Sequence, residues 1–291
     1  GASILSDVEA LSHCMLLWRS FTHWIGGMGV LVFLLAIIPL SGGSHMNLMR
    51  AESPGPSVSK LVPKVQSTAK ILYTIYIILT VVEIIFLLIG KMPLFDTLCL
   101  SFGTAGTGGF GIKNDSIASY STYNQVVITV FMILFGINFN AYYLLLTKKV
   151  MQAAKNEEVR YYLGIIGLAI VAIAINTREM FTSFGRAFQQ AAFQVGSIIT
   201  TTGYATTDFN VWPVFSKTIL VILMFVGACA GSTGGGIKVS RLLILCKSAR
   251  KELQLYLHPN AVKKIKMDDK AIPHEVVRAT NMFLFVYIMI F

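Results

Sequence analysis

The chain has 291 residues, of which 55% are hydrophobic and only 13% are charged, and its mean hydropathy is +0.68. Soluble domains typically carry about 25% charged residues, so this composition excludes an ordinary soluble protein and indicates an integral membrane protein. The net charge of +10 favours basic loops on the cytoplasmic side of a membrane. A nucleic-acid partner is disfavoured, because the basic residues are not interleaved with aromatic ones.

An amphipathic segment lies near the start of the chain and leads into the first apolar run. Two tryptophans within residues 18–24 suit a membrane interface. Residues 25–40 are apolar and contain three glycines, which let neighbouring helices approach closely. Arg19 and His23 lie near the start of this predicted span, and we favour packing or interface anchoring for them over ion binding.

The second apolar run contains a carboxylic acid. Residues 41–70 are polar and hold four basic residues against one acid. Residues 71–89 then predict a spanning helix, since about 20 apolar residues cross a bilayer. Glu83 lies inside this run, where an acid is a candidate functional group. A paired, protonated or interfacial carboxyl fits the same position equally well.

A short, half-apolar segment follows and carries a polar tail. Residues 93–103 are too few to span a membrane, and they run into a stretch rich in glycine and threonine at residues 104–111. Residues 125–146 predict the next span, which is interrupted by two asparagines. We expect Asn138 and Asn140 to bond with neighbouring helices.

The pattern of a full run, a short run and a polar tail then returns. A basic loop that includes Glu157 and Glu158 leads into an apolar run at residues 161–175, and a second short run occupies residues 191–199. The polar tail, Thr-Thr-Thr-Gly-Tyr-Ala at residues 200–205, cannot lie bare in lipid because its backbone groups would be unsatisfied. A row of carbonyl oxygens with a threonine hydroxyl and a glycine is how a potassium filter replaces the ion's water shell.

A glycine-rich stretch breaks the span that follows. Residues 215–226 begin an apolar helix, which breaks at residues 227–236 and resumes to about Lys247. A phosphate-binding loop would read GxxxxGK before Ser or Thr and would follow a strand, whereas here Ile237 separates the last glycine from Lys238. We therefore favour a flexible loop inside a membrane helix, with a glycine-packed kink as the alternative.

The two polar tails align as repeats. Setting Gly108 on Gly203, an offset of 95 residues, aligns them without gaps and also pairs Thr107 with Thr202 and Gly109 with Tyr204. The segment Gly1-Ala2-Ser3 matches them in character, and an acid follows each glycine within a few residues: Asp7, Asp115 and Asp208. The chain therefore contains two complete span–hairpin–span units, with the tail of one before and the head of one after.

Basic residues orient these repeats. Eighteen of the 24 Lys and Arg residues lie in residues 41–70, 147–160 and 238–280, which are all cytoplasmic if the short runs re-enter from outside. The polar tails therefore face outward, with the three acids near the outer mouth. There the acids would raise the local cation concentration, or they simply solvate the loops.

Four motifs are similar to the Trk/Ktr/HKT superfamily of potassium transporters, and within it to the TrkH-type membrane subunits. They are WRSFTHWIGGMG at residues 18–29, SFGTAGTGGF at 101–110, TTTGYA at 200–205 and AGSTGGGIK at 230–238. The resemblance implies an all-α integral membrane fold of repeated span–re-entrant pore helix–span units, arranged as a pseudo-fourfold potassium-channel-like pore. It implies potassium uptake across the bacterial inner membrane, not catalysis, with no cofactor.

The resemblance also divides the chain among four repeats. Residues 1–40 would hold the filter end and second span of the first repeat, and residues 41–160 the second repeat with its cytoplasmic loops. Residues 161–247 would form the third repeat with its broken second span, and residues 248–291 a cytoplasmic loop and the start of the fourth. The first re-entrant helix and the fourth filter are expected to lie outside this chain.

Ion-binding and gating residues are likewise implied by the resemblance. The selectivity filter, where potassium would bind, is expected at Gly1, Ala2, Thr107, Gly108, Gly109, Thr201, Thr202, Gly203 and Tyr204. The gate is expected in a loop beneath the filter, at Gly227, Gly231, Ser232, Thr233, Gly234, Gly235 and Gly236. A glycine at the first-repeat position, where some plant relatives carry serine and favour sodium, suggests potassium.

The implied partners are the lipid bilayer, a second copy in a homodimer and a cytosolic TrkA-type nucleotide-binding regulatory ring. The basic stretch at residues 247–270 is a candidate docking surface, although ordinary positive-inside bias explains it as well. The alternative function is sodium-selective or sodium/proton-coupled transport in the same superfamily. A membrane enzyme or receptor would need clustered His, Asp or Cys side chains, whereas the five histidines and four cysteines are scattered.

Overall fold

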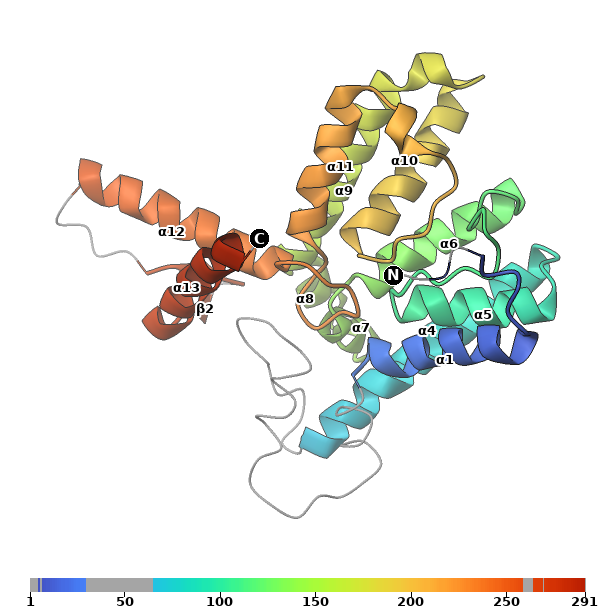
Figure 1. Cartoon of the computed structure of the whole chain (residues 1–291). Coiled ribbons are helices and arrows are strands. Elements are labelled where there is room, and N and C mark those ends of the chain that lie inside the picture. The colour runs from blue at the N-terminus through green and yellow to red at the C-terminus, as the bar shows by residue number, and fades with distance from the viewer. Residues whose placement is uncertain (1–4, 6, 30–64, 259–263, 269, 291) are drawn as a thin grey trace.

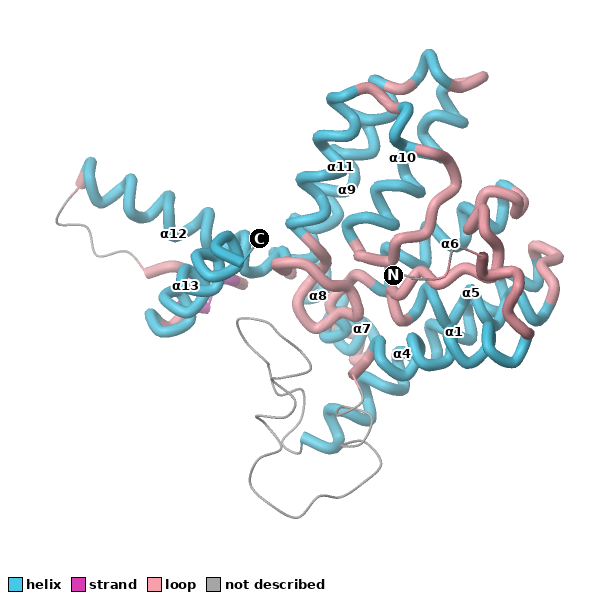
Figure 2. Tube along the Cα trace, viewed as in Figure 1, coloured by secondary structure: helices cyan, strands magenta, loops and turns pink. Residues whose placement is uncertain are grey.

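The computed structural model describes residues 5, 7–29, 65–258, 264–268 and 270–290. Most of this part of the chain is helical, and loops connect the helices (Figure 1, Figure 2). The α-helices are α1 (His13–Gly27), α4 (Val65–Ile89), α5 (Leu94–Ala105), α6 (Thr122–Phe135), α7 (Phe139–Leu146), α8 (Val150–Ala154), α9 (Glu157–Asn176), α10 (Phe184–Ile199), α11 (Val214–Val226), α12 (Val239–Leu257) and α13 (His274–Ile290). The remaining described elements are two 3-10 helices, η1 (Arg178–Met180) and η2 (Phe209–Val211), and an antiparallel pair of strands, β1 (Lys266–Met267) and β2 (Lys270–Ala271).

Two of the described helices are long and apolar enough to cross a bilayer. They are α9 and the part of α4 over Ala69–Ile89, and they lie where the sequence predicts spans at residues 71–89 and 161–175. Both expose large apolar side chains, such as Ile78 and Leu168, which suits contact with lipid. Because lipid tails are as apolar as these side chains, the helices are held together by close packing and hydrogen bonds.

The predicted span at residues 125–146, which two asparagines interrupt in the sequence, is a bent pair of helices. α6 and α7 meet at an angle of 91° around a break at residues 136–138. The Asn138 side chain accepts a hydrogen bond from the amide of Asn140 at 2.9 Å and caps the start of α7. Asparagine favours such caps because its short side chain reaches the amides of the first helical turn.

Two packed groups of helices lie where the sequence predicts the two complete repeats. α4, α5 and α6 surround one apolar core, and α9, α10 and α11 surround another. The second group stands beside the first, while α12 and α13 project to one side (Figure 1). Phe193 and Tyr204 belong to the third repeat, yet they lie in the core of the second. The repeats therefore interlock at the ends of their short helices.

The short helices α5 and α10 precede the two polar tails, as the sequence predicts. At 1.5 Å per residue, their 12 and 16 residues extend about 18 and 24 Å, less than the roughly 30 Å of a bilayer core. The Ser183 hydroxyl accepts a hydrogen bond from the Arg186 amide and caps the start of α10. Both lengths suit helices that enter a membrane and end inside it.

The helix after the glycine-rich break is longer than predicted. α12 continues to Leu257, so part of the basic stretch expected as a loop is helical. Hydropathy detects only where the apolar run stops, whereas Lys, Arg, Glu, Gln and Leu in this stretch are all good helix formers. The Arg241 guanidinium lies 4.0 Å from the ring centre of Phe283 and joins α12 to α13.

The first repeat is described only in part. α1 carries the interface tryptophans and packs along α5. Gly1 and Ala2, most of the apolar run at residues 25–40, and residues 41–64 lie outside the described residues.

Candidate functional site

The two short helices end in the same way. After α5, Thr107 has a φ of +48°, and the amides of Gly108 and Gly109 both donate to the Gly103 carbonyl oxygen at 2.9 and 3.3 Å. After α10, Thr201 has a φ of +59°. The amides of the next two residues both donate to one carbonyl at 2.9 and 3.2 Å, the donors being Thr202 and Gly203 and the acceptor Ser197. The polar tails are therefore structural repeats.

The repeat register differs by one residue from the sequence alignment. The shared closure sets Thr107 on Thr201 and Gly109 on Gly203, an offset of 94, so the offset of 95 was wrong. Gly109 and Gly203 have φ values of +68° and +87°, at which a side chain is strained. The sequence could not choose the right glycine, because Gly108 and Gly109 are adjacent.

Gly108 serves packing against α1. Its φ is not positive, and an added Cβ would come within 1.3 Å of the His23 Nδ1 atom. The His23 ring also packs on Phe110, with 3.8 Å between ring centres, and the Arg19 guanidinium lies 4.4 Å from the same ring centre. The packing role that the sequence favours for Arg19 and His23 is confirmed.

Tyr204 docks the third repeat onto the second. Its phenol donates to the Leu100 carbonyl oxygen at 3.2 Å, and its side chain is only 1% exposed. Its own carbonyl oxygen accepts a hydrogen bond from the Ser197 hydroxyl at 2.6 Å. In the 94-residue register Tyr204 corresponds to Phe110, so the aromatic residue after each glycine packs on the preceding repeat.

The loop between α11 and α12, residues 227–238, is the gate loop of the sequence analysis. Its backbone is left-handed at Gly227, Gly231, Gly236 and Lys238. The backbones of Gly227 and Gly236 are in close contact, because a Cβ added to Gly236 would be 2.5 Å from the Gly227 Cα. The ends of the loop therefore approach each other at a separation that only glycine allows, which explains the break in the span.

The gate loop contacts both polar tails at equivalent threonines. The Thr107 hydroxyl donates to the Thr233 carbonyl oxygen at 2.9 Å, and the Gly235 amide donates to the Thr201 hydroxyl oxygen at 2.7 Å. Gly234 packs against the third-repeat tail as well, because a Cβ there would be 3.1 Å from the Thr200 carbonyl oxygen. The structure thus brings the predicted filter and gate residues of the second and third repeats together.

The gate loop also passes through the break between α6 and α7. Three backbone hydrogen bonds join them: Cys229 N to Gly136 O at 3.0 Å, Thr233 N to Phe135 O at 3.4 Å, and Phe139 N to Gly231 O at 3.0 Å. The bend in the second repeat therefore leaves backbone groups free to bind the loop of the third. Sequence analysis missed this contact, because neither segment carries a signal for the other.

Glu158 is a further residue that sequence analysis missed. It was expected in a cytoplasmic loop, but it is only 2% exposed and lies in the first turn of α9. Its Oε1 atom accepts hydrogen bonds from the amides of Ala230 at 2.6 Å and Ser240 at 3.1 Å. Its Oε2 atom accepts one from Asn138 Nδ2 at 3.2 Å, the bond to a neighbouring helix expected for that asparagine. An acid in a first helical turn ordinarily indicates only a favourable helix dipole.

The three outer acids, Asp7, Asp115 and Asp208, are all exposed. Asp7 links the first repeat to the second, because Asn114 Nδ2 donates to Asp7 Oδ1 at 2.8 Å and this hydrogen bond lowers the pKa of Asp7. Asp208 accepts a hydrogen bond from the Asn210 amide at 2.9 Å and caps η2. The effect of these acids on the local cation concentration stays a prediction.

Glu83 is fully buried in α4. Its carboxyl group therefore does not face lipid, and its role stays a prediction.

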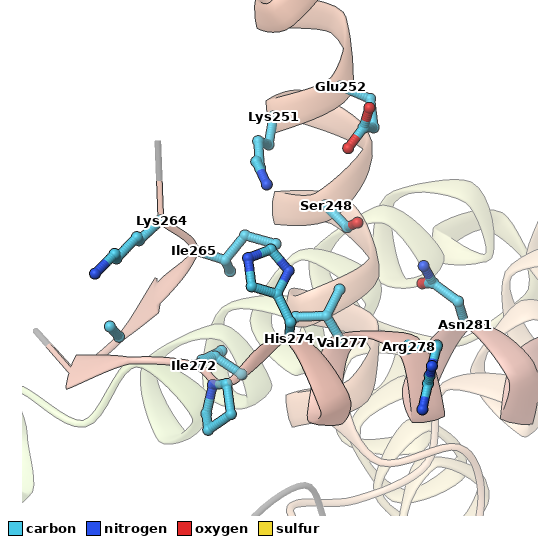
Figure 3. A pocket seen from close by; sticks show the side chains of 12 residues that line it. Ser248, Lys251, Glu252, Lys264, Ile265, Ile272, His274, Val277, Arg278 and Asn281 are labelled. Carbon is cyan, nitrogen blue, oxygen red and sulfur yellow. The ribbon is translucent and has the colours of Figure 1, made fainter. Parts of the chain in front are cut away.

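A pocket of about 490 Å³ lies among α12, the β1–β2 hairpin and the start of α13. Figure 3 shows Lys251 and Glu252 on α12 and His274 and Arg278 on α13 around it, with Lys264 at the hairpin. Part of its lining, including Lys251 and Lys264, lies in the stretch 247–270 predicted as a docking surface, and that role stays a prediction.

Comparisons with known proteins identify the family of this chain. A family profile described as TrkH, cation transport protein, matches residues 1–291. The chain belongs to the TrkH family. TrkH-family proteins are membrane transporters and not enzymes, so the predicted family and the non-enzymatic class are confirmed.

Characterised TrkH-family relatives are longer than this chain. The Trk system potassium uptake proteins TrkH of Escherichia coli K12 and Vibrio parahaemolyticus are 35% and 37% identical to it, and each match covers 100% of the chain and 61% of the relative. The crystal structure of the potassium transporter TrkH from Vibrio parahaemolyticus matches with a TM-score of 0.84 at 32% identity, covering 99% of this chain and 60% of that one. The predicted all-α membrane fold is confirmed, and the chain spans about three-fifths of these relatives.

Proposed function

We propose that this chain forms part of a transporter that carries potassium into the bacterial cell through the inner membrane. Support comes from the relatives named as potassium uptake proteins and from the paired tails at the ends of α5 and α10. Transport makes and breaks no bond. The membrane potential drives cation entry with about 2.3 kcal/mol per charge per 100 mV.

The observation that carries the proposal is the shared closure of the two polar tails. Two successive amides of each tail donate to the end of the short helix behind them. In the described part of the chain, no backbone amide donates to the carbonyl oxygens of Thr107, Gly108 or Thr201. Left-handed residues alternate with ordinary ones along both tails, and in this proposal the free carbonyls face the ion path. Such a row of oxygens replaces the water shell of an ion.

In this proposal the filter residues are Thr107, Gly108 and Gly109 in the second repeat and Thr201, Thr202 and Gly203 in the third. Gly1 and Ala2 supply the first repeat by family resemblance. Tyr204 holds its segment in place through its phenol, because its carbonyl oxygen is already bound by Ser197. The gate loop lies against the tails through Thr233 and Gly235 and blocks the path until it moves.

The partners follow from the family resemblance and belong to the same proposal. A second copy would complete a homodimer, and a cytosolic TrkA-type nucleotide-binding ring would bind the basic cytoplasmic region around α12. Potassium is the transported substrate, and no resident cofactor is required.

Ion flux in the full-length transporter tests the function. The protein should restore growth at low potassium in a strain that lacks potassium uptake, and it should load proteoliposomes with potassium faster than with sodium. Gly203→Ala should reduce this preference, whereas Gly185→Ala should not, because an added Cβ at Gly185 has no neighbour closer than 3.9 Å. Equal or faster sodium flux in the unchanged protein would support the sodium-transporting alternative instead.

A further inference from the structure

One buried carboxylate ties together three separate segments of the chain. Glu158, in the first turn of α9, accepts hydrogen bonds from Ala230 in the gate loop, Ser240 in α12 and Asn138 before α7. All three partners donate N–H groups, and both carboxylate oxygens are used. An ionised carboxylate only accepts hydrogen bonds, so the surroundings match its charged form.

The two amides on Glu158 Oε1 lie on either side of residues 231–236 of the gate loop. Ala230 precedes Gly231, and Ser240 follows Gly236 and Lys238. A single oxygen atom therefore fixes both ends of the segment that contacts Thr107 and Thr201. Inside this segment, Lys238 Nζ donates to the Gly234 carbonyl oxygen, which holds the loop compact between its two fixed ends.

The residues around Glu158 bind the cytoplasmic hairpin. Asp268 Oδ1 accepts a hydrogen bond from the Glu157 amide at 2.8 Å, and Asp268 Oδ2 accepts one from Asn156 Nδ2 at 3.3 Å. Lys247 Nζ donates to the Glu157 carboxylate and, at 2.7 Å, to the Lys266 carbonyl oxygen. The first turn of α9 therefore holds the β1–β2 hairpin on one side and the gate loop on the other.

We propose that Glu158 is the positioning residue that holds the gate loop against the filter, and that Asp268 connects the cytoplasmic hairpin to it through the start of α9. This inference rests on the proposed gating role of residues 227–238. A protein or ligand that moves the hairpin would shift the first turn of α9 and loosen the loop at Ala230 and Ser240. The hairpin is thus the place where a cytoplasmic signal reaches the gate.

The hydrogen bonds of Glu158 predict that two substitutions of this residue will loosen the gate loop to different extents. Glu158→Ala leaves two buried backbone amides and the partly buried Asn138 side chain without their acceptor, and removing the partner of a buried donor carries a large penalty. Glu158→Gln keeps one acceptor oxygen, but its amide nitrogen must face either Asn138 Nδ2 or the two backbone amides, all of which are donors. The glutamine variant should therefore lie between the alanine variant and the unchanged protein.

The rate at which a thiol in the gate loop is labelled reports the position of the loop independently of ion flux. Cys229 is fully buried next to Ala230, whereas Cys14 and Cys246 are exposed. In the full-length transporter with every other cysteine replaced, a membrane-impermeant maleimide applied to inside-out vesicles should label Cys229 slowly. Glu158→Ala should raise this labelling rate by about tenfold, equivalent to about 1.4 kcal/mol, and should raise potassium flux into proteoliposomes.

The hairpin contact is tested with Asp268→Gly. Asp268 has a φ of +50°, so glycine keeps its backbone conformation while removing both acceptor oxygens. Because the side chain is exposed, the fold should persist, and labelling of Cys229 should rise by about threefold, equivalent to roughly 0.7 kcal/mol. Glu179→Gln, at an exposed carboxylate near the other end of α9, is the matched control and should change neither readout.

The outcomes separate the inference from the function on which it rests. Faster labelling together with faster flux supports both. Faster labelling with unchanged flux supports Glu158 as the anchor of the loop and contradicts the gating role of the loop. Unchanged labelling in a Glu158→Ala protein that elutes as the native species overturns the role of Glu158. Unchanged labelling in Asp268→Gly alone overturns the connection to the hairpin.

Discussion

The second and third repeats close their short helices in the same way but break their following spans differently. In the second repeat, three residues separate α6 from α7, and Asn138 caps the new helix. In the third, residues 227–238 separate α11 from α12 and form a loop with four left-handed residues. The closure of the polar tail is therefore common to both repeats, whereas of these two repeats the third carries the long glycine-rich break.

This difference shows how the loop obtains its partners. The short break leaves the carbonyls of Phe135 and Gly136 and the amide of Phe139 to bind the gate loop. The loop in the long break is held by these groups, by the hydroxyls of Thr107 and Thr201 and by Glu158. The loop is therefore held by groups on other segments of the chain. A movement of those segments would release it, as the proposed gating role requires.

Removing the loop's contact with the filter is expected to have the largest effect. Deleting residues 234–236 from the full-length transporter takes away the hydrogen bond from Gly235 to Thr201 and the packing of Gly234 on Thr200. Loss of about 1.4 kcal/mol of loop attachment corresponds to about a tenfold rise in potassium flux. Uptake into liposomes measures it, and unchanged flux would rule out a blocking loop.

The one-residue register is tested by the adjacent glycines of the second repeat. Gly109→Ala should cost about 1–2 kcal/mol of strain in a left-handed backbone and reduce potassium flux. Gly108→Ala should disturb folding through its clash with His23.

A second substitution separates these two causes. His23→Ala should restore the Gly108→Ala protein, because it removes the clashing ring, but it should not restore Gly109→Ala. Thermal unfolding and uptake measure both double variants. Rescue of Gly109→Ala by His23→Ala would contradict the 94-residue register and favour Gly108 as the proposed filter glycine.

Tyr204 and Phe110 follow the equivalent glycines of the two polar tails, and only Tyr204 carries a hydroxyl. Tyr204→Phe loses the hydrogen bond to the Leu100 carbonyl, which should lower the free energy of unfolding by about 1 kcal/mol. The equivalent Phe110 packs on His23 without a hydroxyl. Thermal unfolding in detergent measures the change, and an unaltered unfolding temperature would mean that Tyr204 docks by packing alone.

The smallest effect is expected at the outer contact between the first and second repeats. Asn114→Ala removes the amide that lowers the pKa of Asp7. A lowered pKa stabilises the folded protein at pH values above the ordinary pKa near 3.8, and this contribution is lost as the pH falls through the lowered value. The unfolding temperatures of variant and unchanged protein should therefore differ slightly at pH 7 and less in acid, where only the lost hydrogen bond from the Val8 amide to Asn114 Oδ1 still counts. An undiminished difference at pH 3 would contradict a role for the Asp7 charge.

Local sequence patterns predict much of the molecule. Hydropathy located α4, α5, α9 and α11, because each depends on the side chains of its own segment. The glycine-rich stretch located the gate loop for the same reason, since the close approach of Gly227 and Gly236 needs glycine at both positions. The motifs together indicated the family.

Only the tertiary structure decided how these parts meet. The choice between Gly108 and Gly109 depends on His23, the bend after α6 depends on the loop that passes through it, and the role of Glu158 depends on Ala230 and Ser240. Each of these contacts joins residues more than seventy positions apart. Periodicity and composition report the environment of a side chain but not its partner, so a buried acid that binds a distant loop looks the same in sequence as an acid in a basic loop.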